Sequence, residues 1–489
     1  MEPCDLGACE ARALIGEKSL SPVELLDSCL RRIELVNRQV NGVVALDTER
    51  AMTEARAAER RVMQGDALPA LHGLPVGVKD LVETEGLRTT FGSKVYEHHV
   101  PTRDEGVVAS LRQQGGIVCM KTNTPEWGAG GNTFNPVYGV SGNPFRPGLT
   151  CGGSSGGSAI ALAAGMVPLA LGSDNAGSLR IPAALCGVVG MRATAGVVPS
   201  EARLVALSHL HVDGPMARSV RDTALLLGCL ATGDTRDAFA GTVDPALRDV
   251  PDPLDLSTLR VAITEDLGGF APVDRVIRAT FRERIDGLRS HFRCADDASP
   301  NVIGADRVYE VLRAVGYVGT WGDRFAKAPD RWGRLVRANL ESAARFTLAD
   351  VGAAHADYTR LYAAAHAFFE THDLLLLPTV AVSAWPKHTI YPPMIDGAPV
   401  ANYFDWVRIT YAITLLNLPC ISIPCGLDPE GIPFGLQIVA PRNRDAFLLR
   451  AALAIESVLE RHQATKRPRP DIARLAAVVP DDPLGQPVQ

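Results

Sequence analysis

Two glycine-rich stretches decide how the rest of this chain is interpreted: Cys151-Gly-Gly-Ser-Ser-Gly-Gly-Ser158 and Gly172-Ser-Asp-Asn-Ala-Gly-Ser-Leu-Arg180. Glycines ahead of a helix can cradle a phosphate on exposed N–H groups, but neither stretch has the GxxxxGK[ST] or GxGxxG spacing. The glycines can also serve packing alone. A third interpretation is an acyl-transfer site, in which successive N–H groups before Ser178 stabilise an oxyanion. The glycines by themselves leave all three interpretations open.

A nucleophilic serine needs a base, and neither stretch contains a histidine. Only seven of the 49 basic residues are lysine, and a desolvated Lys can act as a neutral base whereas Arg cannot. Lys79 comes near the end of the alternating segment Leu74–Asp80, which is typical of a strand in an apolar setting. A Ser–Lys arrangement is therefore the attractive form of the third interpretation.

Helices and strands alternate on both sides of the glycine-rich segment. Helices are predicted after the capping box at Ser21–Glu24, and over Thr48–Gln64, 104–114, Ala159–Ala164, Val273–Leu288 and most of 300–370. Strands are predicted over Leu74–Asp80, Ile117–Met120, Arg260–Thr264, Leu374–Leu377, Cys420–Pro424 and Phe434–Val439. This alternation predicts an α/β fold with helices packed on a sheet.

Composition and charge exclude several classes of protein. Apolar residues make up 46% of the chain, which is enough for a large core. The formal net charge of 49 − 55 = −6 gives no electrostatic case for nucleic acid or an anionic membrane. No stretch approaches the ~20 apolar residues that span a bilayer, and the N-terminus lacks a signal-peptide pattern. His98-His99 and His209-Val-His211 lack a third metal ligand. We therefore expect a cytoplasmic protein without metal or cofactor.

Five segments, in order from about residue 10 to 460, together resemble the amidase signature family. His72-Gly-Leu-Pro-Val-Gly-Val-Lys79-Asp80 is similar to the family's catalytic-lysine strand, and Lys121-Thr-Asn-Thr-Pro-Glu126 to its GKTN-x-PE element. Residues 152–187 are similar to its serine- and glycine-rich signature, and 213–218 and 433–439 also fit. The resemblance implies an α/β amidase signature fold, with one large mixed twisted β-sheet covered by helices on both faces.

The resemblance also implies residue roles. Ser178 matches the nucleophile, Ser154 the bridging serine and Lys79 the base, and the Gly153–Ser154 peptide bond is expected to be cis. The residues matching the backbone oxyanion loop are Asn175, Ala176, Gly177 and Ser178, and those matching supporting groups are Ser155, Asp174 and Arg180.

The chain departs from the family at two positions. Ala176 stands where the family usually has glycine, and Arg192-Ala-Thr194 stands where it usually has Lys-Pro-Thr. A methyl group makes positive φ cost ~1–2 kcal/mol, so Ala176 is expected at negative φ with its N–H aimed into the pocket. We expect its Cβ to lie either near the scissile carbonyl or against the strand behind it.

The predicted function is hydrolysis of a linear C–N bond in an amide or carbamate through an acyl-enzyme, with a small-molecule amide as substrate. One alternative is the amidase subunit of a glutamine-dependent tRNA amidotransferase. Another is a non-catalytic binding protein on a degenerate amidase fold, which would require loss of the triad. The aromatic residues expected to line an apolar acyl pocket are Trp127, Phe134, Tyr317, Trp321, Tyr403 and Trp406.

The chain is expected to form a single amidase signature domain over residues 1–470, followed by a tail over 471–489 that is rich in Pro and Asp. Within the domain, residues 300–370 are expected to be a helical and variable region on the substrate side. A homodimer is left open as the assembly.

Overall fold

The computed structural model describes every residue except 1, 204, 206, 481, 483 and 485–489. Its strands are β1 (Val43–Leu46), β2 (Pro75–Lys79), β3 (Ile117–Thr122), β4 (Phe134–Asn135), β5 (Gly139–Val140), β6 (Leu169–Asp174), β7 (Val189–Arg192), β8 (Val212–Ala217), β9 (Arg260–Ile263), β10 (Cys294–Asp297), β11 (Leu374–Pro378), β12 (Met394–Ile395), β13 (Ala398–Pro399), β14 (Cys420–Leu427) and β15 (Pro433–Val439).

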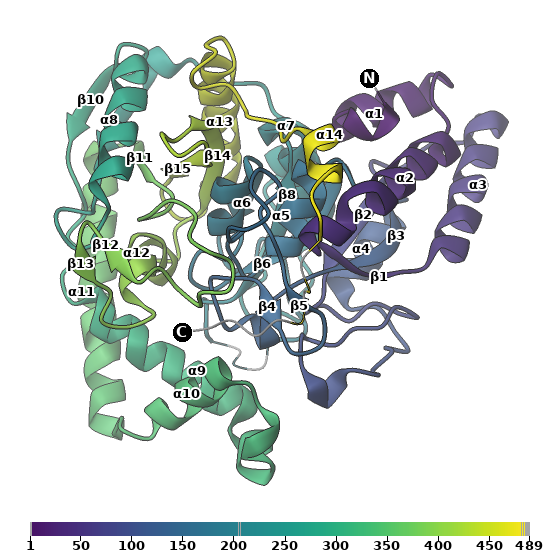
Figure 1. Ribbon diagram of the computed structural model, residues 1–489. Coiled ribbons are helices and arrows are strands. Elements are labelled where there is room, and N and C mark those ends of the chain that lie inside the picture. Colours follow the sequence, from purple (N-terminus) through teal and green to yellow (C-terminus); the bar gives the residue numbers. More distant parts are fainter. Residues whose placement is uncertain (1, 204, 206, 481, 483, 485–489) are drawn as a thin grey trace.

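Its α-helices surround these strands (Figure 1). They are α1 (Ala8–Gly16), α2 (Pro22–Val40), α3 (Thr48–Gln64), α4 (Gly106–Gln113), α5 (Gly156–Ala163), α6 (Arg180–Cys186), α7 (Val220–Leu230), α8 (Arg275–Arg289), α9 (Ala305–Lys327), α10 (Arg334–Ala343), α11 (Leu348–Thr371), α12 (Arg408–Leu415), α13 (Asp445–Leu459) and α14 (Ile472–Ala476).

Eleven of the described strands form one sheet in the order β1-β3-β2-β6-β8-β7-β14-β15-β11-β9-β10. Pairing is parallel along β3-β2-β6 and along β11-β9-β10, and antiparallel elsewhere. This confirms the expected large mixed sheet. Both parallel groups need long crossover connections, which the helices between these strands supply.

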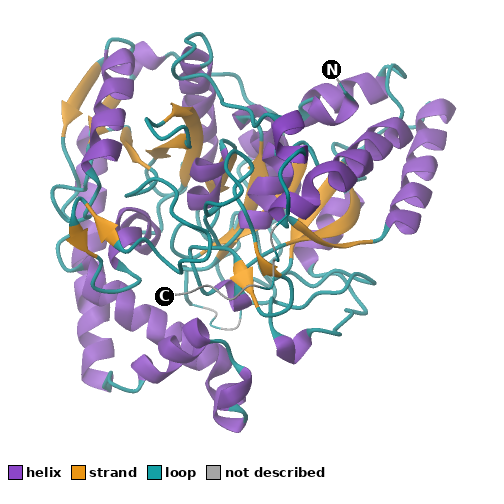
Figure 2. Ribbon diagram, viewed as in Figure 1, coloured by secondary structure: helices purple, strands orange, loops and turns teal. Residues whose placement is uncertain are grey.

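Helices cover both faces of this sheet (Figure 2). Successive side chains of a strand point to opposite faces, and β6 shows where each face leads. Leu169 and Leu171 join a hydrophobic cluster with residues of α1, α4, α7 and α13, while Ala170 joins a second cluster with residues of α2 and α5. Each face therefore has its own core.

Several predicted elements are confirmed with nearly the predicted bounds. Ser21 caps α2 in a capping box with Glu24, and α3 covers Thr48–Gln64 as expected. The predicted strands around Leu74, Ile117, Arg260, Leu374, Cys420 and Phe434 correspond to β2, β3, β9, β11, β14 and β15. Helix caps and apolar runs are signals between residues close in sequence, so the sequence alone was enough to predict these elements.

The helix after the first glycine-rich stretch packs unusually close to the chain beneath it. An ideal Cβ at Gly157 would lie 2.1 Å from the Asn123 nitrogen and 2.6 Å from the Gly42 carbonyl oxygen, so no side chain fits there. The glycine lets the N-terminus of α5 approach the end of β3. This approach helps fix the loop that carries Ser154 and Ser155.

The region 300–370 is helical, as predicted, and consists mainly of α9, α10 and α11. In Figure 1 α9 and α10 lie together at the lower end of the molecule. A small third cluster, comprising Ala129, Tyr317, Trp332, Val336 and Leu340, joins these helices to the segment after β3.

The expected tail over 471–489 stays a prediction, with residues 481, 483 and 485–489 outside the described part of the chain, but its first residues are packed on the domain. Residues Ile472–Ala476 form α14, Leu475 is buried, and Gln39 Nε2 of α2 donates to the Ala476 carbonyl oxygen at 3.3 Å. A buried Leu anchors this short helix in spite of the surrounding Pro and Asp residues.

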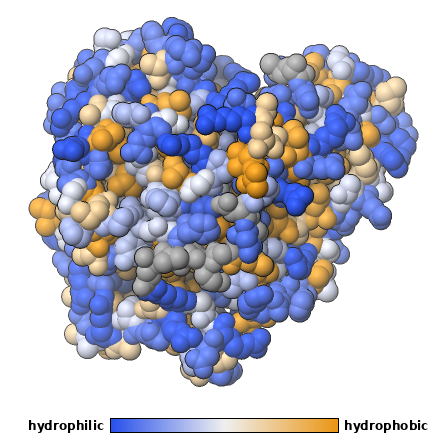
Figure 3. Space-filling view, viewed as in Figure 1, coloured by the Kyte–Doolittle hydropathy of each residue, from blue (hydrophilic) through white to orange (hydrophobic). Residues whose placement is uncertain are grey.

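The visible surface is mainly hydrophilic, with apolar side chains scattered across it (Figure 3). Within the described part of the chain, no helix combines the length and apolar character needed to cross a bilayer.

Candidate active site

Lys79 is the last residue of β2, and its side chain is completely buried. Its amino group contacts three hydroxyl oxygens, of Ser154 at 2.6 Å, Ser155 at 2.9 Å and Ser173 at 3.0 Å. Burial lowers the pKa of Lys79 to about 7, against the opposing charge of Asp213 and Asp174. An amine in this environment is neutral in a large fraction of molecules near pH 7, so it can accept a proton.

Ser154 and Ser155 follow the Gly153–Ser154 peptide bond, which is cis as the resemblance implied. Ser154 points its hydroxyl at Lys79. Ser155 joins neighbouring segments, because its N–H donates to the Ser178 carbonyl oxygen at 3.1 Å and its hydroxyl donates to the Ser173 carbonyl oxygen at 3.1 Å. Ser155 thus holds the two glycine-rich stretches together.

Ser178 lies in the turn that leads into α6, is half-buried, and lines the same cavity as Ser154. Its hydroxyl makes no hydrogen bond to any described residue. The Lys79–Ser154 contact is therefore already formed, and the Ser154–Ser178 contact is not. Catalytic hydrogen bonds often tighten only when substrate binds.

The loop of residues 174–178 presents main-chain N–H groups beside Ser178. The N–H groups of Asn175, Ala176 and Ser178 donate to no described residue. The expectation for Gly177 needs correction, because its N–H donates to Asp174 Oδ1 at 2.8 Å. Three of the four expected oxyanion donors are therefore available in this structure.

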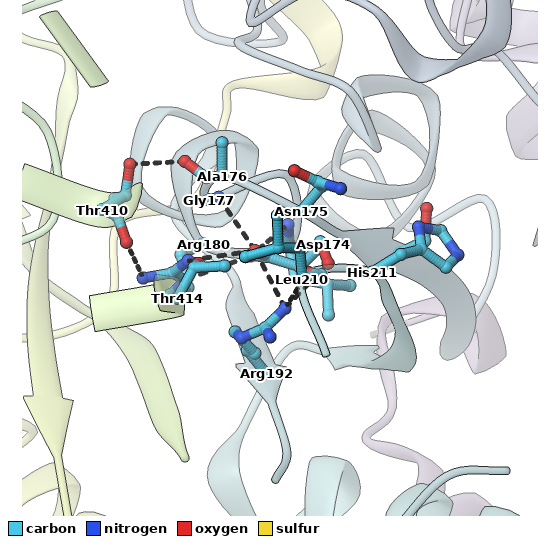
Figure 4. Close-up of polar contacts among 12 residues, drawn as sticks. Asp174, Asn175, Ala176, Gly177, Arg180, Arg192, Leu210, His211, Thr410 and Thr414 are labelled. Carbon is cyan, nitrogen blue, oxygen red and sulfur yellow. Dashed lines mark hydrogen bonds and ion pairs between the residues drawn. The ribbon is translucent and has the colours of Figure 1, made fainter. Parts of the chain in front are cut away.

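Asp174 and Arg180 form a buried ion pair that shapes this loop (Figure 4). Arg180 contacts both carboxylate oxygens at 3.0 Å. Its remaining donors reach the Thr410 carbonyl oxygen, Thr414 Oγ1 and Gln437 Oε1. Burial alone would raise the pKa of Asp174, but the guanidinium groups beside it hold that pKa well below its usual range.

Arg192, at the position where the family usually has lysine, supports the same loop from the other side. Its Nη1 donates to the carbonyl oxygens of Asp174 and Leu210, both at 2.8 Å, and its Nη2 donates to that of His209 at 2.8 Å. A guanidinium offers two nitrogen atoms in a fixed plane, so it reaches carbonyls that one ammonium group could not span.

Ala176, the other departure, lies outside the left-handed region, which confirms its expected φ. The unusual conformation belongs to its neighbour: Gly177 has φ 116° and an ideal Cβ there would lie 2.7 Å from Thr410. The Ala176 carbonyl oxygen accepts from Thr410 Oγ1 at 2.6 Å, and its methyl points away from the Arg180–Asp174 pair in Figure 4. Ala176 packs against the core and does not line the cavity.

A cavity of about 390 Å³ opens beside Ser154 and Ser178. Three of the six predicted aromatic residues line it, namely Trp127, Tyr317 and Trp321. Trp127 and Trp321 lie 5.7 Å apart between ring centroids, and Tyr317 meets Trp321 edge-on at 4.8 Å. The cavity therefore has an apolar aromatic wall close to the serines.

The other three aromatic predictions are wrong for this cavity. Trp406 is buried and packs edge-on against Trp385, Tyr403 packs beside it, and Phe134 lies in the small β4–β5 hairpin. Their aromatic character serves core packing, which the sequence alone does not distinguish from pocket lining.

The cavity also contains residues that sequence reasoning missed: Phe91, Tyr96, Glu105, His211, Asp213, Arg313 and Arg324. The helical period could have found two of these, because Arg313 and Arg324 share a face of α9 with Tyr317 and Trp321. The others come from separate segments that only the fold brings together.

No group of three or more His, Cys, Asp or Glu residues in the described chain is arranged to hold a metal ion. His209, one of the histidines considered from the sequence, makes a 2.7 Å hydrogen bond to the Leu415 carbonyl oxygen. His211 lines the cavity and lies 3.7 Å from Asp213.

A family model for amidases matches residues 24–449 of the chain. The chain belongs to the amidase family. An acylamidase of Rhodococcus erythropolis is 34% identical over 95% of this chain and 97% of its own length. A glutamyl-tRNA(Gln) amidotransferase subunit of Thermus thermophilus is 35% identical over 92% of this chain and 97% of its own length.

The fold of this amidase is also found in a bacterial aryl acylamidase of the amidase signature enzymes. That crystal structure is 24% identical, has a TM-score of 0.85, and the match covers 99% of both chains. The predicted amidase signature fold and the predicted amide-hydrolysing enzyme are thereby confirmed.

Proposed function

We propose that this amidase cleaves linear amides through an acyl-enzyme on Ser178, with Ser154 and Lys79 as the proton relay. The observation that carries the proposal is the 2.6 Å contact between Lys79 Nζ and Ser154 Oγ at a completely buried amine. Its hydrogen-bond partners are serine oxygens, so no carboxylate contact holds it in the protonated form. The non-catalytic alternative would require loss of these side chains, and all three are present.

The relay uses the Lys79–Ser154 contact and requires Ser178 to approach Ser154 when substrate binds. Neutral Lys79 takes the proton of Ser154, Ser154 takes that of Ser178, and Ser178 Oγ attacks the carbonyl carbon. The N–H groups of Asn175, Ala176 and Ser178 are the proposed oxyanion donors. The C–N bond then breaks as the relay returns the proton to the leaving nitrogen. Water, deprotonated by the same relay, hydrolyses the Ser178 ester and releases the carboxylic acid.

The cavity supports small aryl or alkyl amides as substrates. Its aromatic wall of Trp127, Tyr317 and Trp321 matches an apolar group, and its volume suits a ligand of drug size or smaller. The similarity to the acylamidase of Rhodococcus erythropolis supports the same class. A carbamate would present a carbonyl of similar shape to Ser178.

A second candidate is the amidase subunit of a tRNA amidotransferase. It is favoured by the 35% identity to the glutamyl-tRNA(Gln) amidotransferase subunit of Thermus thermophilus. That function would require partner subunits and glutamine, and the two functions therefore differ in what the isolated chain hydrolyses.

The test is a hydrolysis screen of the purified chain on anilides, aliphatic amides, carbamates and glutamine. We expect anilide turnover by the wild type and none by Ser178→Ala, together with an acyl adduct on Ser178 detected by mass spectrometry. Turnover of glutamine alone would favour the amidotransferase subunit. Unchanged anilide turnover by Ser178→Ala would overturn the proposed mechanism.

Three further expectations stay predictions. They are the cytoplasmic location, the single domain over 1–470, and the homodimer. Size-exclusion chromatography with light scattering would decide the last of them.

A further inference from the structure

One face of α9 forms a wall of the cavity. The residues it contributes share a helical stripe: Arg313, Gly316, Tyr317, Thr320, Trp321 and Arg324. The stripe begins one turn after Tyr309, whose hydroxyl donates to Asn175 Oδ1 at 3.1 Å. Because a helix rises ~1.5 Å per residue, Arg313 lies about 6 Å further along the axis than Tyr309. Arg313 is thus about one helical turn from Tyr309, which contacts the proposed oxyanion loop.

Arg313 is buried, with 8% of its surface exposed, yet its side chain has no carboxylate partner among the described residues. Its Nε donates to Asn339 Oδ1 at 3.0 Å, and its Nη2 donates to the Tyr317 hydroxyl at 2.7 Å. Both acceptors are neutral. The guanidinium also interacts with the Tyr309 hydroxyl, a third neutral group, and the residue lines the cavity.

Each of the other buried guanidinium groups either contacts a carboxylate or donates to several main-chain oxygens. Arg180 and Arg192 both pair with Asp174, and Arg32 pairs with Asp5. Arg218 pairs with no carboxylate of the described chain but donates to four main-chain carbonyl oxygens. Arg313 has neutral acceptors and lies over the rings of Tyr317 and Phe404, but it has neither a carboxylate nor a set of main-chain oxygens among the described residues. A buried cation without an anion is costly, so Arg313 calls for an anion from outside the chain.

The remaining charges of the cavity do not supply that anion. Arg103 and Arg203 already pair with Glu201 and Asp237, which do not line it. The acids that do line it are Glu83, Glu105 and Asp213, and none of them lies within ion-pair distance of Arg313. Arg324, near the far end of the stripe, donates to the Tyr96 hydroxyl at 3.2 Å.

We infer that Arg313 binds a carboxylate of the substrate, so that the preferred substrates are amides carrying a carboxylate a short distance from the scissile carbonyl. A guanidinium offers a planar pair of donors that matches a carboxylate. The inference rests on the proposed function, because it takes Ser178 as the point of attack. The carboxylate can belong to the acyl chain or to the amine, since both present the same group to Arg313.

Two matched pairs of substrates test this with the wild-type enzyme alone. Succinanilate against pentananilide places the carboxylate on the acyl side, and 4-acetamidobenzoate against acetanilide places it on the amine side. We expect kcat/KM to be at least tenfold higher for the anionic member of one pair, and that pair identifies the side. An anionic member that is no better than its neutral partner in both pairs would overturn the inference.

Variants of Arg313 test whether this residue causes the preference for anionic substrates. Arg313→Gln should lower the anionic-to-neutral ratio of kcat/KM at least tenfold, and Arg313→Lys should retain part of it. Arg307→Gln is the matched control, because it removes a cation from the same helix that pairs with Asp350 at the surface, and it should leave the ratio unchanged. An unchanged ratio in a folded Arg313→Gln would overturn the assignment.

The two proposals fail separately. If Ser178→Ala turns over both members of a pair at the wild-type rate, the proposed function fails. If Ser178→Ala is inactive and the wild type shows no preference for the anionic members, only the inference about Arg313 fails. A variant that does not fold leaves the wild-type preference as the deciding measurement.

Discussion

Lys79 Nζ and Ser154 Oγ lie 2.6 Å apart at the end of β2, and neither side chain has appreciable contact with solvent. The amine is surrounded by serine oxygens, and burial lowers its pKa to about 7. A buried lysine with this pKa is suited to moving protons rather than to pairing with a carboxylate.

Replacing Lys79 should lower the rate strongly, even when the substitute is an arginine that keeps the positive charge. Lys79→Arg and Lys79→Ala should each lower kcat by about 10²–10⁴-fold, because an arginine stays protonated and cannot accept the Ser154 proton. Steady-state anilide hydrolysis measures this, with Lys466→Arg at an exposed site as the control. Lys79→Arg with kcat within about tenfold of wild type would rule out the relay.

The rate should rise with pH through about 7. Lys79 acts in its neutral form, and a pKa lowered to about 7 makes that form increase about tenfold between pH 6 and 8. The measurement is kcat/KM as a function of pH. Because a histidine also lines the cavity, the profile of His211→Gln should keep the same midpoint. A profile that falls across this range would contradict a lysine base.

Adding a methyl group at position 177 should lower activity. Removing the methyl group at position 176 should leave activity nearly unchanged. Gly177→Ala combines φ 116° with a Cβ 2.7 Å from Thr410, so it should displace the loop and lower kcat by at least about tenfold, or 1.4 kcal/mol. Ala176→Gly should leave the ranking of a size series of anilides unchanged, since Ala176 does not line the cavity. A changed ranking would show that Ala176 faces substrate after all.

Removing the charge of Asp174 should destabilise the fold. Asp174→Asn would leave Arg180 and Arg192 buried without their counter-ion, at a cost of about 3–5 kcal/mol in the free energy of unfolding. Denaturant titration measures this, and the exposed control Asp357→Asn should change it by less than about 0.5 kcal/mol. A loss at Asp174 no larger than that of the control would mean that the pair does not hold the loop.

The same pair sets a pH dependence of stability. The native pKa of Asp174 lies below its unfolded value, so its contribution is fully present above about pH 4 and is lost as pH falls through the lowered native pKa. The stability difference between wild type and Asp174→Asn should therefore stay constant from pH 7 to about 5. A difference that vanishes already near neutral pH would contradict the lowered pKa.

Much of the fold and the chemical centre could be predicted from the sequence. Local signals define elements such as α2, where Ser21 and Glu24 form the capping box, and β2, where apolar residues lead up to Lys79. The serine spacing and the family resemblance are enough to identify Lys79, Ser154 and Ser178 as candidates. These features depend on residues close in sequence or on fixed motifs, which a single chain displays directly.

Other features depend on contacts between distant segments. Only the fold shows that Trp406 packs against Trp385 while Trp127 lines the cavity, and that Leu475 anchors a helix in the expected tail. The partner of each polar group likewise depends on the fold. The Gly177 N–H donates to Asp174, whereas Arg313 has no carboxylate partner in the described chain.

The sequence by itself therefore determined the family, the sheet-and-helix architecture and the residues able to do the chemistry. The tertiary structure decided which of these groups are buried together, which hydrogen bonds are already formed, and which buried cation lacks a counter-ion among the described residues. The physical reason is that burial and hydrogen bonding depend on neighbours brought together by folding. These neighbours lower the pKa of Lys79 and surround Arg313 with neutral groups.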